Sequence, residues 1–297
     1  KAMLHYNSHP GNANLDFLPV DILKEIEIIK GDVQDLGFLN NAFRDMSGVF
    51  HLAALIGIPY SYLAPTSYVS TNVIGTTNVL EAAKVNEISA VVHTSTSETY
   101  GTARYTPIDE MHPMQGQSPY SATKIGADKI AEGYFNSFDL PVVTVRPFNC
   151  YGPRQSSRAI IPTIVSQALM RNEVSLGDLT PVRDFTYVTD TVEGFVKAAE
   201  EKSAIGEVIN LGSGKAISIG ELATLIFEIM GIKASVQNDA KRIRPKDSEV
   251  MQLLCDGQKA KTILDWSPNV SFRQGLLEVI DFVKNNISLF ATDKYVV

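Results

Sequence analysis

The chain has 297 residues, 44% of them hydrophobic and 20% charged, and a net charge of −7 at pH 7. This composition is typical of a soluble globular protein with one large domain, or one domain and a smaller appendage. The acidic balance and the short apolar runs exclude a nucleic-acid-binding arm and a membrane protein. With two cysteines and no visible signal-peptide pattern, we expect a cytoplasmic protein without a disulfide framework.

The chain opens within a predicted strand. Lys1 is not an initiator methionine, and the apolar run from Ala2 to Leu4 leads directly into a polar stretch. We therefore expect about 20–40 further residues before Lys1, the size of one strand, a turn and a helix. The alternative is an edge strand that happens to begin the protein.

Short apolar segments alternate with helical patterns through the first half of the chain. The patterns predict strands at 27–30, 48–54, 90–95 and 141–146, and helices at 77–88 and 120–135. Strands that alternate with helices predict an α/β fold with a doubly wound parallel sheet of the Rossmann type. Ligands bind such sheets beyond the carboxyl ends of the strands, so the polar residues that follow each strand are candidates for the site.

The last third of the chain has a different pattern. Ser218 with Glu221, and Ser271 with Gln274, are capping-box spacings, and each precedes an amphipathic helical stripe. We therefore predict a sheet domain at 1–155, truncated at its N-terminus, and a smaller, mostly helical lobe at 156–297. Part of 175–215 is predicted to return to the sheet, because 207–210 is strand-like.

Two segments carry candidate chemistry. Tyr120 and Lys124 are four residues apart in a predicted helix, so they share one face and lie about 6 Å apart along its axis. A neighbouring ammonium and an oxidised nicotinamide ring would both favour the tyrosine phenolate, which could then act as a base. Hydroxyl and carboxylate side chains follow the strand at 90–95, in the run from Thr94 to Glu98. Taken alone, these segments could also be an ordinary amphipathic helix and a solvated loop.

Together, these segments resemble the extended short-chain dehydrogenase/reductases, the NAD-dependent epimerase/dehydratase family. The family's Gly-Asp-Val, His-Leu-Ala-Ala, Asn-x-x-Gly-Thr-x-Asn, Arg-Pro-Phe-Asn-x-Tyr-Gly-Pro-Arg and Arg-Asp-Phe-x-Tyr-Val-x-Asp motifs match residues 31–33, 51–54, 72–78, 146–154 and 183–190. The resemblance implies a tightly bound NAD or NADP that is regenerated in each turnover. It also implies cofactor contacts from Asp32, Val33, Leu52, Ala53, Ala54, Asn72, Ser95, Tyr120, Lys124 and Phe148.

The chain departs from the family pattern at the phosphate-binding turn. The family's Gly-x-x-Gly-x-x-Gly turn is absent from these residues and would precede Lys1, while the segment from Gly212 to Lys215 lacks the third glycine and the helix of such a turn. The run from Asn7 to His9 stands where NAD-preferring enzymes usually carry Asp, which leaves NADP open. The histidines are scattered, so no metal site is expected.

The run Thr96-Ser97-Glu98 resembles that of the GDP-mannose 4,6-dehydratases and of bacterial dehydratases acting on GDP- or UDP-N-acetylglucosamine. The resemblance implies a nucleotide-sugar 4,6-dehydratase of cell-surface polysaccharide biosynthesis, which moves hydride from C4 to C6 of a nucleotide-diphosphate sugar. The implied catalytic residues are Thr96, Ser97, Glu98, Tyr120 and Lys124. The implied substrate contacts are Thr96, Asn149, Arg183 and Arg244, since guanidinium groups suit diphosphate oxygens.

Other interpretations stay open at this point. Within the family, the alternatives are a nucleotide-sugar 4-epimerase and a UDP-glucuronate decarboxylase, which also carries Thr-Ser-Glu. Outside enzymes, the alternative is a catalytically silent cofactor-binding relative. Arg183 beside Asp184 could also be a surface ion pair with no ligand.

The two predicted helices at 77–88 and 120–135 carry small and apolar residues on more than one face. In relatives these helices pair across a two-fold axis as a four-helix bundle, and a closed two-fold contact is the commonest oligomer. We therefore expect a homodimer that pairs through these helices, and the residues that suggest it are Ala82, Ala83, Ala127, Ala131 and Tyr134.

Overall fold

A four-stranded parallel sheet forms the centre of the structure. The computed structural model describes residues 1–6 and 11–290, and the run from Asn7 to His9 that left NADP open lies outside the described residues. The sheet has the order β3 (Gly48–His51), β4 (Ala90–Thr94), β5 (Val142–Pro147), β9 (Val208–Leu211). A separate pair of parallel strands joins β1 (Ala2–His5) to β2 (Ile28–Gly31). The predicted Rossmann-type α/β fold is confirmed.

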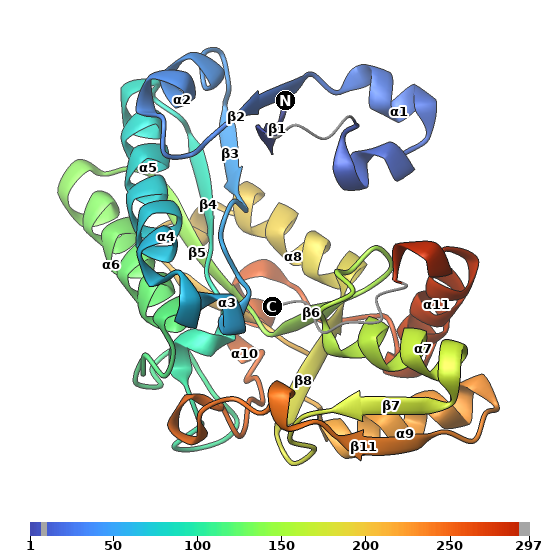
Figure 1. Cartoon of the computed structure of the whole chain (residues 1–297). Coiled ribbons are helices and arrows are strands. Elements are labelled where there is room, and N and C mark those ends of the chain that lie inside the picture. The colour runs from blue at the N-terminus through green and yellow to red at the C-terminus, as the bar shows by residue number, and fades with distance from the viewer. Residues whose placement is uncertain (7–10, 291–297) are drawn as a thin grey trace.

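Helices cover both faces of the four-stranded sheet (Figure 1). One face carries α2 (Leu36–Ala42), α5 (Gly75–Val85) and α6 (Pro119–Phe138), and the other carries α8 (Val188–Glu200) and α10 (Gln258–Leu264). The short helices α3 (Ile58–Leu63) and α4 (Pro65–Tyr68) and a π-helical turn (Val69–Ile74) lead into α5, while α1 (Val20–Glu25) lies between β1 and β2. Strands β4, β5 and β9 are thus covered on both faces, as their apolar residues require, while Phe50 on the edge strand β3 stays 47% exposed.

The second lobe has its own small sheets and its own core. Strands β6 (Asn149–Tyr151), β8 (Val182–Tyr187) and β10 (Ala216–Ser218) form one sheet, and β7 (Glu173–Leu176) pairs with β11 (Ser235–Asn238). Against them pack α7 (Ile160–Arg171), α9 (Ile219–Met230) and α11 (Phe272–Asn285). The predicted capping box at the start of α9 is confirmed, because Ser218 Oγ accepts from the Glu221 amide at 3.2 Å and the Glu221 carboxylate accepts from the Ser218 amide at 2.9 Å.

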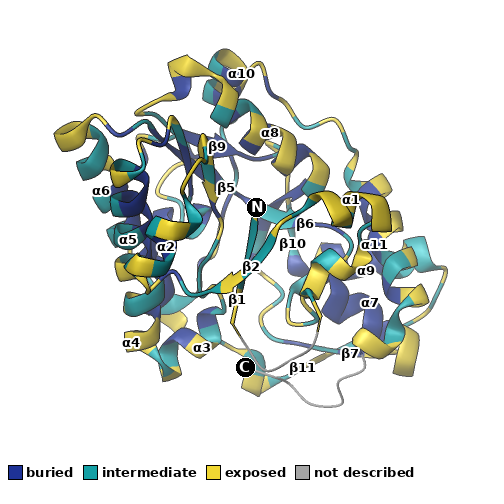
Figure 2. Cartoon of the chain, turned by 90° about the horizontal axis from the view of Figure 1, so that it is seen from above, coloured by how far each residue is buried: buried dark blue, intermediate teal, exposed yellow. Residues whose placement is uncertain are grey.

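The chain returns from the lobe to the sheet domain twice. The first return supplies α8 and β9, and the second supplies α10, which packs on β9 and α8. Trp266, 1% exposed, fixes the second return, since its indole Nε1 donates to the Asp190 carbonyl at 2.8 Å. Figure 2 shows the buried residues gathered where the helices meet the strands. Both returns belong to the core of the sheet domain, because α8, β9 and α10 share one cluster of buried side chains.

The small residues predicted to form a dimer contact lie inside the chain. Ala82, Ala83, Ala127 and Ala131 are each 0% exposed, because α5 and α6 press these positions against the sheet and each other. These four alanines therefore have no surface to offer a partner, and the dimer itself stays a prediction. Tyr134 is partly buried and donates to Glu81 at 3.0 Å. Through the described part of the chain, no helix has the length and apolar content needed to cross a membrane.

Candidate active site

The catalytic pair predicted from sequence lies in the first two turns of α6. Ser118 caps this helix, with its Oγ accepting from the Ser121 amide at 3.1 Å, and Pro119 occupies the first turn. Tyr120 is 7% exposed and Lys124 is 3% exposed. The Lys124 ammonium donates to the carbonyl of Thr94, the last residue of β4, at 2.5 Å. The pair is therefore fixed at the carboxyl end of β4, where ligands bind parallel sheets.

The segment after β4 is an ordered, capped 3₁₀ helix and not a solvated loop. Thr96 caps a 3₁₀ helix (Ser97–Tyr100), and its Oγ1 accepts from the Glu98 amide at 3.2 Å. Ser97 is 3% exposed, while Glu98 is partly buried. Thr96 also hydrogen-bonds the Tyr120 hydroxyl. The structure therefore brings Thr96, Glu98 and Tyr120 together, as the sequence predicted for a shared site.

Without a bound cofactor, the surroundings of Tyr120 favour its protonated phenol. Burial raises the pKa of Tyr120 well above its usual value, the hydrogen bond with Thr96 lowers it, and the negative charge of Glu98 raises it again. Burial lowers the pKa of Lys124 to about 8, while the charge of Asp128 raises it. A tyrosine base here consequently needs positive charge from its surroundings, and the charge state of Lys124 changes near neutral pH.

A buried network beneath the pair was missed by the sequence analysis. Asp128, one helical turn after Lys124, accepts hydrogen bonds from His93 Nε2 at 3.0 Å, Ser95 Oγ at 2.8 Å and Arg146 Nη2 at 2.9 Å. All four side chains are 5% exposed or less. The available signal was the position of Asp128 on the same helical face as Tyr120 and Lys124, together with charged residues inside the apolar strands β4 and β5.

The residues at the carboxyl end of β3 suit one face of a dinucleotide. Leu52 is 64% exposed, and Ala53 and Ala54 are partly exposed beside it. Asn72, 1% exposed, clamps the end of this segment: its Oδ1 accepts from the Leu55 amide at 2.8 Å and its Nδ2 donates to the Leu55 carbonyl at 2.9 Å. An exposed apolar edge held rigid next to Ser95 and Tyr120 fits the nicotinamide half of NAD.

The other predicted cofactor residues are Asp32, which lies beside the β1–β2 pair, and Val33 and Phe148, which are buried. Asp32 directly follows β2, with its carboxylate 3.3 Å from His5 Nε2, and stays partly exposed. Val33 is 4% exposed in a core cluster. Phe148 is 3% exposed and packs with Tyr100, so any contact with a ligand there would come from its backbone. These assignments stay predictions.

In the segment from Gly212 to Lys215, the amides of Ser213, Gly214 and Lys215 are already bonded within the protein. The Asp184 carboxylate accepts from the Ser213 amide at 2.8 Å and from the Gly214 amide at 2.9 Å. A carboxylate already occupies the place an anion would take, so this turn is no phosphate cradle. Within residues 1–6 and 11–290, no three His, Cys, Asp or Glu side chains are grouped to hold a metal ion.

The two predicted substrate arginines converge on one carboxylate. Arg183 on β8 is 6% exposed, and its Nη2 lies 3.1 Å from Glu249 Oε1, while Arg244 Nη1 lies 3.2 Å from the same oxygen. Arg183 is thus no surface ion pair with Asp184. Burial lowers the pKa of Arg183, and the charges of Glu98 and Glu249 raise it, which places Arg183 near the catalytic turn.

Asn149, on β6, holds a buried oxygen with no partner. Its Oδ1 makes no hydrogen bond, a rare state for a buried amide and one that a bound ligand could relieve.

The segment that carries Arg244 and Glu249 is tied to the sheet domain, since Tyr62 and Ser248 share a 2.6 Å hydrogen bond and Gln117 donates to the Asp247 carbonyl at 3.0 Å. Both lobes therefore contribute to one site.

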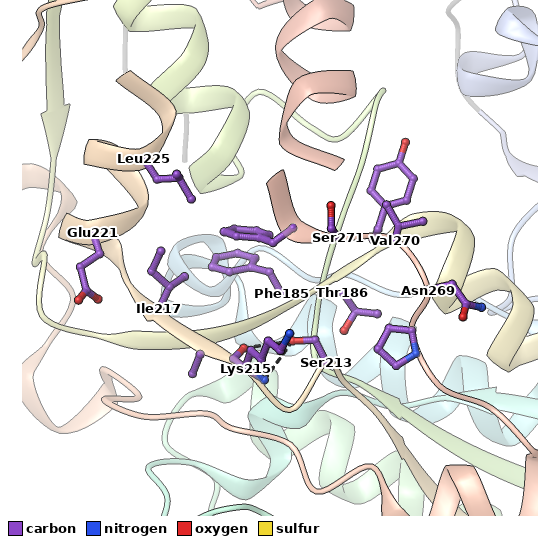
Figure 3. A pocket seen from close by; sticks show the side chains of 14 residues that line it. Phe185, Thr186, Ser213, Lys215, Ile217, Glu221, Leu225, Asn269, Val270 and Ser271 are labelled. Atoms are coloured by element: carbon purple, nitrogen blue, oxygen red, sulfur yellow. Dashed lines mark hydrogen bonds between the residues drawn. The ribbon is translucent and has the colours of Figure 1, made fainter. Parts of the chain in front are cut away.

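A separate cavity of about 710 Å³ lies within the second lobe (Figure 3). Its apolar wall includes Phe185 and Phe272, whose rings stack with centroids 5.6 Å apart, and its polar rim includes Ser213, Lys215 and Glu221. None of the predicted catalytic or substrate residues lines it. The cavity is therefore distinct from the site at the carboxyl end of β4.

The fold and the site together define a class of protein. A Rossmann-type sheet with a Tyr-x-x-x-Lys pair at the carboxyl end of its strands is the arrangement of an extended short-chain dehydrogenase/reductase. The chain belongs to the family of NAD-dependent nucleotide-sugar dehydratases and epimerases, because residues 4–279 match the family model described as GDP-mannose 4,6 dehydratase.

Relatives of known name include both epimerases and dehydratases. The chain is 31% identical over 268 residues to a UDP-glucose 4-epimerase of Mycolicibacterium smegmatis, a match that covers 88% of this chain and 84% of the epimerase. It is 30% identical over 262 residues to a dTDP-glucose 4,6-dehydratase of Streptomyces antibioticus, covering 88% of this chain and 77% of the dehydratase.

Solved structures give the same mixture. A dTDP-glucose 4,6-dehydratase from Streptomyces venezuelae with NAD bound has a TM-score of 0.86 and 27% identity, covering 97% of this chain and 89% of that one. A UDP-glucuronic acid 4-epimerase from Bacillus cereus, in complex with UDP-glucuronic acid and NAD, has a TM-score of 0.83 and 32% identity, covering 90% of this chain and 85% of that one. Similarity thus decides the family and leaves the reaction to the site residues.

Proposed function

We propose that the protein is a nucleotide-sugar 4,6-dehydratase that uses NAD and releases a 4-keto-6-deoxy sugar nucleotide. The observation that carries the proposal is Glu98, a partly buried carboxylate held by the Thr96 turn beside Tyr120. Epimerisation at C4 needs a base for the 4-hydroxyl only, whereas elimination of water needs a second base for the C5 proton. Glu98 supplies that second base. The NAD bound in similar solved structures favours NAD over NADP.

The residues divide the reaction between them. Tyr120 takes the proton of the sugar 4-hydroxyl, Lys124 supplies positive charge nearby, and Thr96 hydrogen-bonds the same oxygen. When bound, NAD supplies the hydride acceptor for C4, the hydride donor for C6 and a positive charge that favours the Tyr120 phenolate. Its nicotinamide half would be held by five predicted cofactor residues: Leu52, Ala53, Ala54, Asn72 and Ser95.

Elimination follows oxidation. The 4-keto group acidifies the C5 proton, and Glu98 accepts it. The C6 hydroxyl leaves as water after protonation by Glu98 or a relayed water, because the Ser97 hydroxyl has no useful acidity at neutral pH. C6 then receives the hydride and C5 receives a proton from solvent. One water is lost, and the oxidised cofactor is restored.

The second lobe supplies the substrate contacts. Arg183 and Arg244 present two guanidinium groups that suit diphosphate oxygens, and the unpartnered Asn149 Oδ1 can accept a hydrogen bond from the substrate. Because Arg183 lies near Glu98, a diphosphate bound there would bring the hexose to the catalytic turn.

Mass spectrometry of products tests the proposal. The full-length protein with NAD is incubated with a panel of UDP-, GDP- and dTDP-hexoses. We expect a product lighter by one water, without stoichiometric build-up of reduced cofactor. Carbon dioxide from a UDP-glucuronate, or an isomer of unchanged mass, would assign a decarboxylase or an epimerase instead. Cofactor binding without turnover of any substrate would assign a silent relative.

We also propose a homodimer formed through the outer sides of α5 and α6. Exposed apolar side chains at the ends of these helices are Ile74, directly before α5, Val85 and Phe138, which are 50%, 59% and 52% exposed. We expect light scattering at micromolar concentration to give a dimer mass, and Val85→Glu to shift it towards the monomer. Val192→Glu is the control, since Val192 is 55% exposed on α8 over the opposite face of the sheet. A monomeric parent protein would contradict the proposal.

A further inference from the structure

Asp128 is the centre of the buried network behind the catalytic pair. Its Oδ1 accepts from His93 Nε2 at 3.0 Å, and its Oδ2 accepts from Ser95 Oγ at 2.8 Å and from Arg146 at 2.9 and 3.1 Å. These partners come from β4 and β5, so the carboxylate ties α6 to two neighbouring strands. Four hydrogen bonds to one 4% exposed carboxylate fix its position closely.

Arg146 is fixed in turn from its other side. Its Nη1 donates to the Tyr100 hydroxyl at 2.9 Å, its guanidinium carbon lies 4.9 Å from the centre of the Tyr100 ring, and the Tyr100 hydroxyl donates to Asn210 Oδ1 at 2.8 Å. The chain of contacts thus runs from α6 across β5 to β9. A carboxylate and a guanidinium that are each bonded from several sides have little freedom to move, which makes them a rigid support for the site next to them.

The charges in this network can be assigned from its bonds. Burial raises the pKa of Asp128, but the hydrogen bond from His93 and the charge of Arg146 outweigh burial and hold it at about 2. Burial lowers the pKa of His93, while its hydrogen bond with Asp128 raises it. His93 is therefore neutral at pH 7 and donates from Nε2, while its Nδ1 has no partner. Asp128 is the one anion of the network, and Arg146 and Lys124 are its cations.

We propose that Asp128 is a positioning residue that keeps the Lys124 ammonium charged and seated against Thr94, and thereby sets the upper pH limit of catalysis. A buried ammonium without an anion would lose its proton, because burial favours the neutral amine. Asp128 lies one turn away on the same helical face, and Arg146 and His93 prevent it from turning elsewhere. The proposal rests on the catalytic role proposed for Lys124.

Other groups around Lys124 do not replace Asp128. The Thr94 carbonyl on β4 accepts its hydrogen bond but carries no charge. The remaining titratable or charged neighbours are neutral at pH 7 or cationic; they are His51 on β3, His93 on β4, Tyr120 on α6 and Arg146 on β5. Burial, with His93 and Lys124 nearby, lowers the pKa of His51 well below its usual value. The negative charge near Lys124 therefore comes from Asp128.

The test compares two variants of the full-length protein. Asp128→Asn leaves Arg146 as an uncompensated buried charge, which can prevent folding. The double variant Asp128→Asn/Arg146→Met removes both charges, a change that is often tolerated. In each folded variant we expect the alkaline limb of the kcat/KM profile to move to lower pH by about 1–3 pH units, the usual effect of an adjacent opposite charge.

A second measurement does not depend on activity. Carbon-13 NMR of lysine-labelled protein without substrate follows the titration of Lys124, assigned by its loss in Lys124→Met. Burial lowers the pKa of Lys124 to about 8, and we expect a lower midpoint in both variants than in the parent. Asp190→Asn is the control, because Asp190 is 3% exposed and bonded to the Val270 amide on the other side of the sheet. It should lower stability and leave both curves in place.

The outcomes separate the two proposals. An unchanged Lys124 titration in the double variant would overturn the role of Asp128, even if the protein proves to be a dehydratase. A shifted titration would support it, even if mass spectrometry shows a different reaction. Loss of activity without any movement of the pH limb or of the Lys124 titration would reduce Asp128 to a folding role and also overturn the proposal.

Discussion

Glu98→Gln is expected to suppress water loss by about 10²–10⁴, the usual contribution of a general base. The amide keeps the size and the hydrogen-bonding shape of the carboxylate but cannot accept the C5 proton. Oxidation at C4 uses Tyr120 and Lys124 and should continue. The substrate would therefore stop at its 4-keto form, and reduced nicotinamide should accumulate up to one equivalent of enzyme. Absorbance in single-turnover experiments, together with product mass, measures both effects.

A matched control is Glu200→Gln, because Glu200 lies on α8 and is exposed to solvent. It should dehydrate at the parent rate. The same substitution at Glu98 also removes a negative charge near Tyr120, which in the folded protein raises the pKa of the phenol. C4 oxidation in Glu98→Gln should thus be equal to the parent or slightly faster at neutral pH. Dehydration at the parent rate would show that Glu98 is not the C5 base.

Periodicity predicted the sheet domain well, because its strands are apolar and its helices amphipathic. The strands expected at 90–95 and 141–146 appear as β4 and β5, and the strand-like 207–210 appears as β9 beside β5. The second return through α10 was not predicted. Its helix is short, and the packing of Trp266 under α8 is a long-range contact that leaves no local pattern. Local pattern also could not show that the alanines of α5 and α6 are buried in the core, since small residues are equally suited to a core and to an interface.

The candidate site was predicted where motifs are contiguous and missed where they are not. Tyr120, Lys124 and Glu98 follow from short runs at strand and helix ends, and the structure brings them together. The network of His93, Asp128 and Arg146 joins residues from three elements, and each alone looks like an isolated polar residue in an apolar segment. Glu249, which receives both predicted substrate arginines, was missed for the same reason.

Tyr120→Phe is expected to stop both oxidation and dehydration, with a loss of about 10²–10⁴ or more in turnover. The ring stays, so the packing against Tyr68, whose ring centroid lies 6.3 Å away, is kept. Only the hydroxyl that takes the proton from the sugar 4-hydroxyl is lost. Because oxidation precedes elimination, no reduced nicotinamide should appear, and this separates Tyr120→Phe from Glu98→Gln.

The loss of turnover in Tyr120→Phe reports on the chemical step only if this variant still binds the nucleotide sugar. The substrate contacts proposed for Arg183, Arg244 and Asn149 lie in the other lobe, so the nucleotide-sugar Kd of Tyr120→Phe, measured by calorimetry, should stay within a few-fold of the parent. The control is Tyr151→Phe, which removes a hydroxyl from a 2% exposed tyrosine bonded to the Phe272 carbonyl in the lobe core. It should cost about 1 kcal/mol of stability and leave turnover near the parent value. Reduced nicotinamide forming in Tyr120→Phe at the parent rate would assign the C4 proton to another base, with Thr96 the nearest hydroxyl to test next.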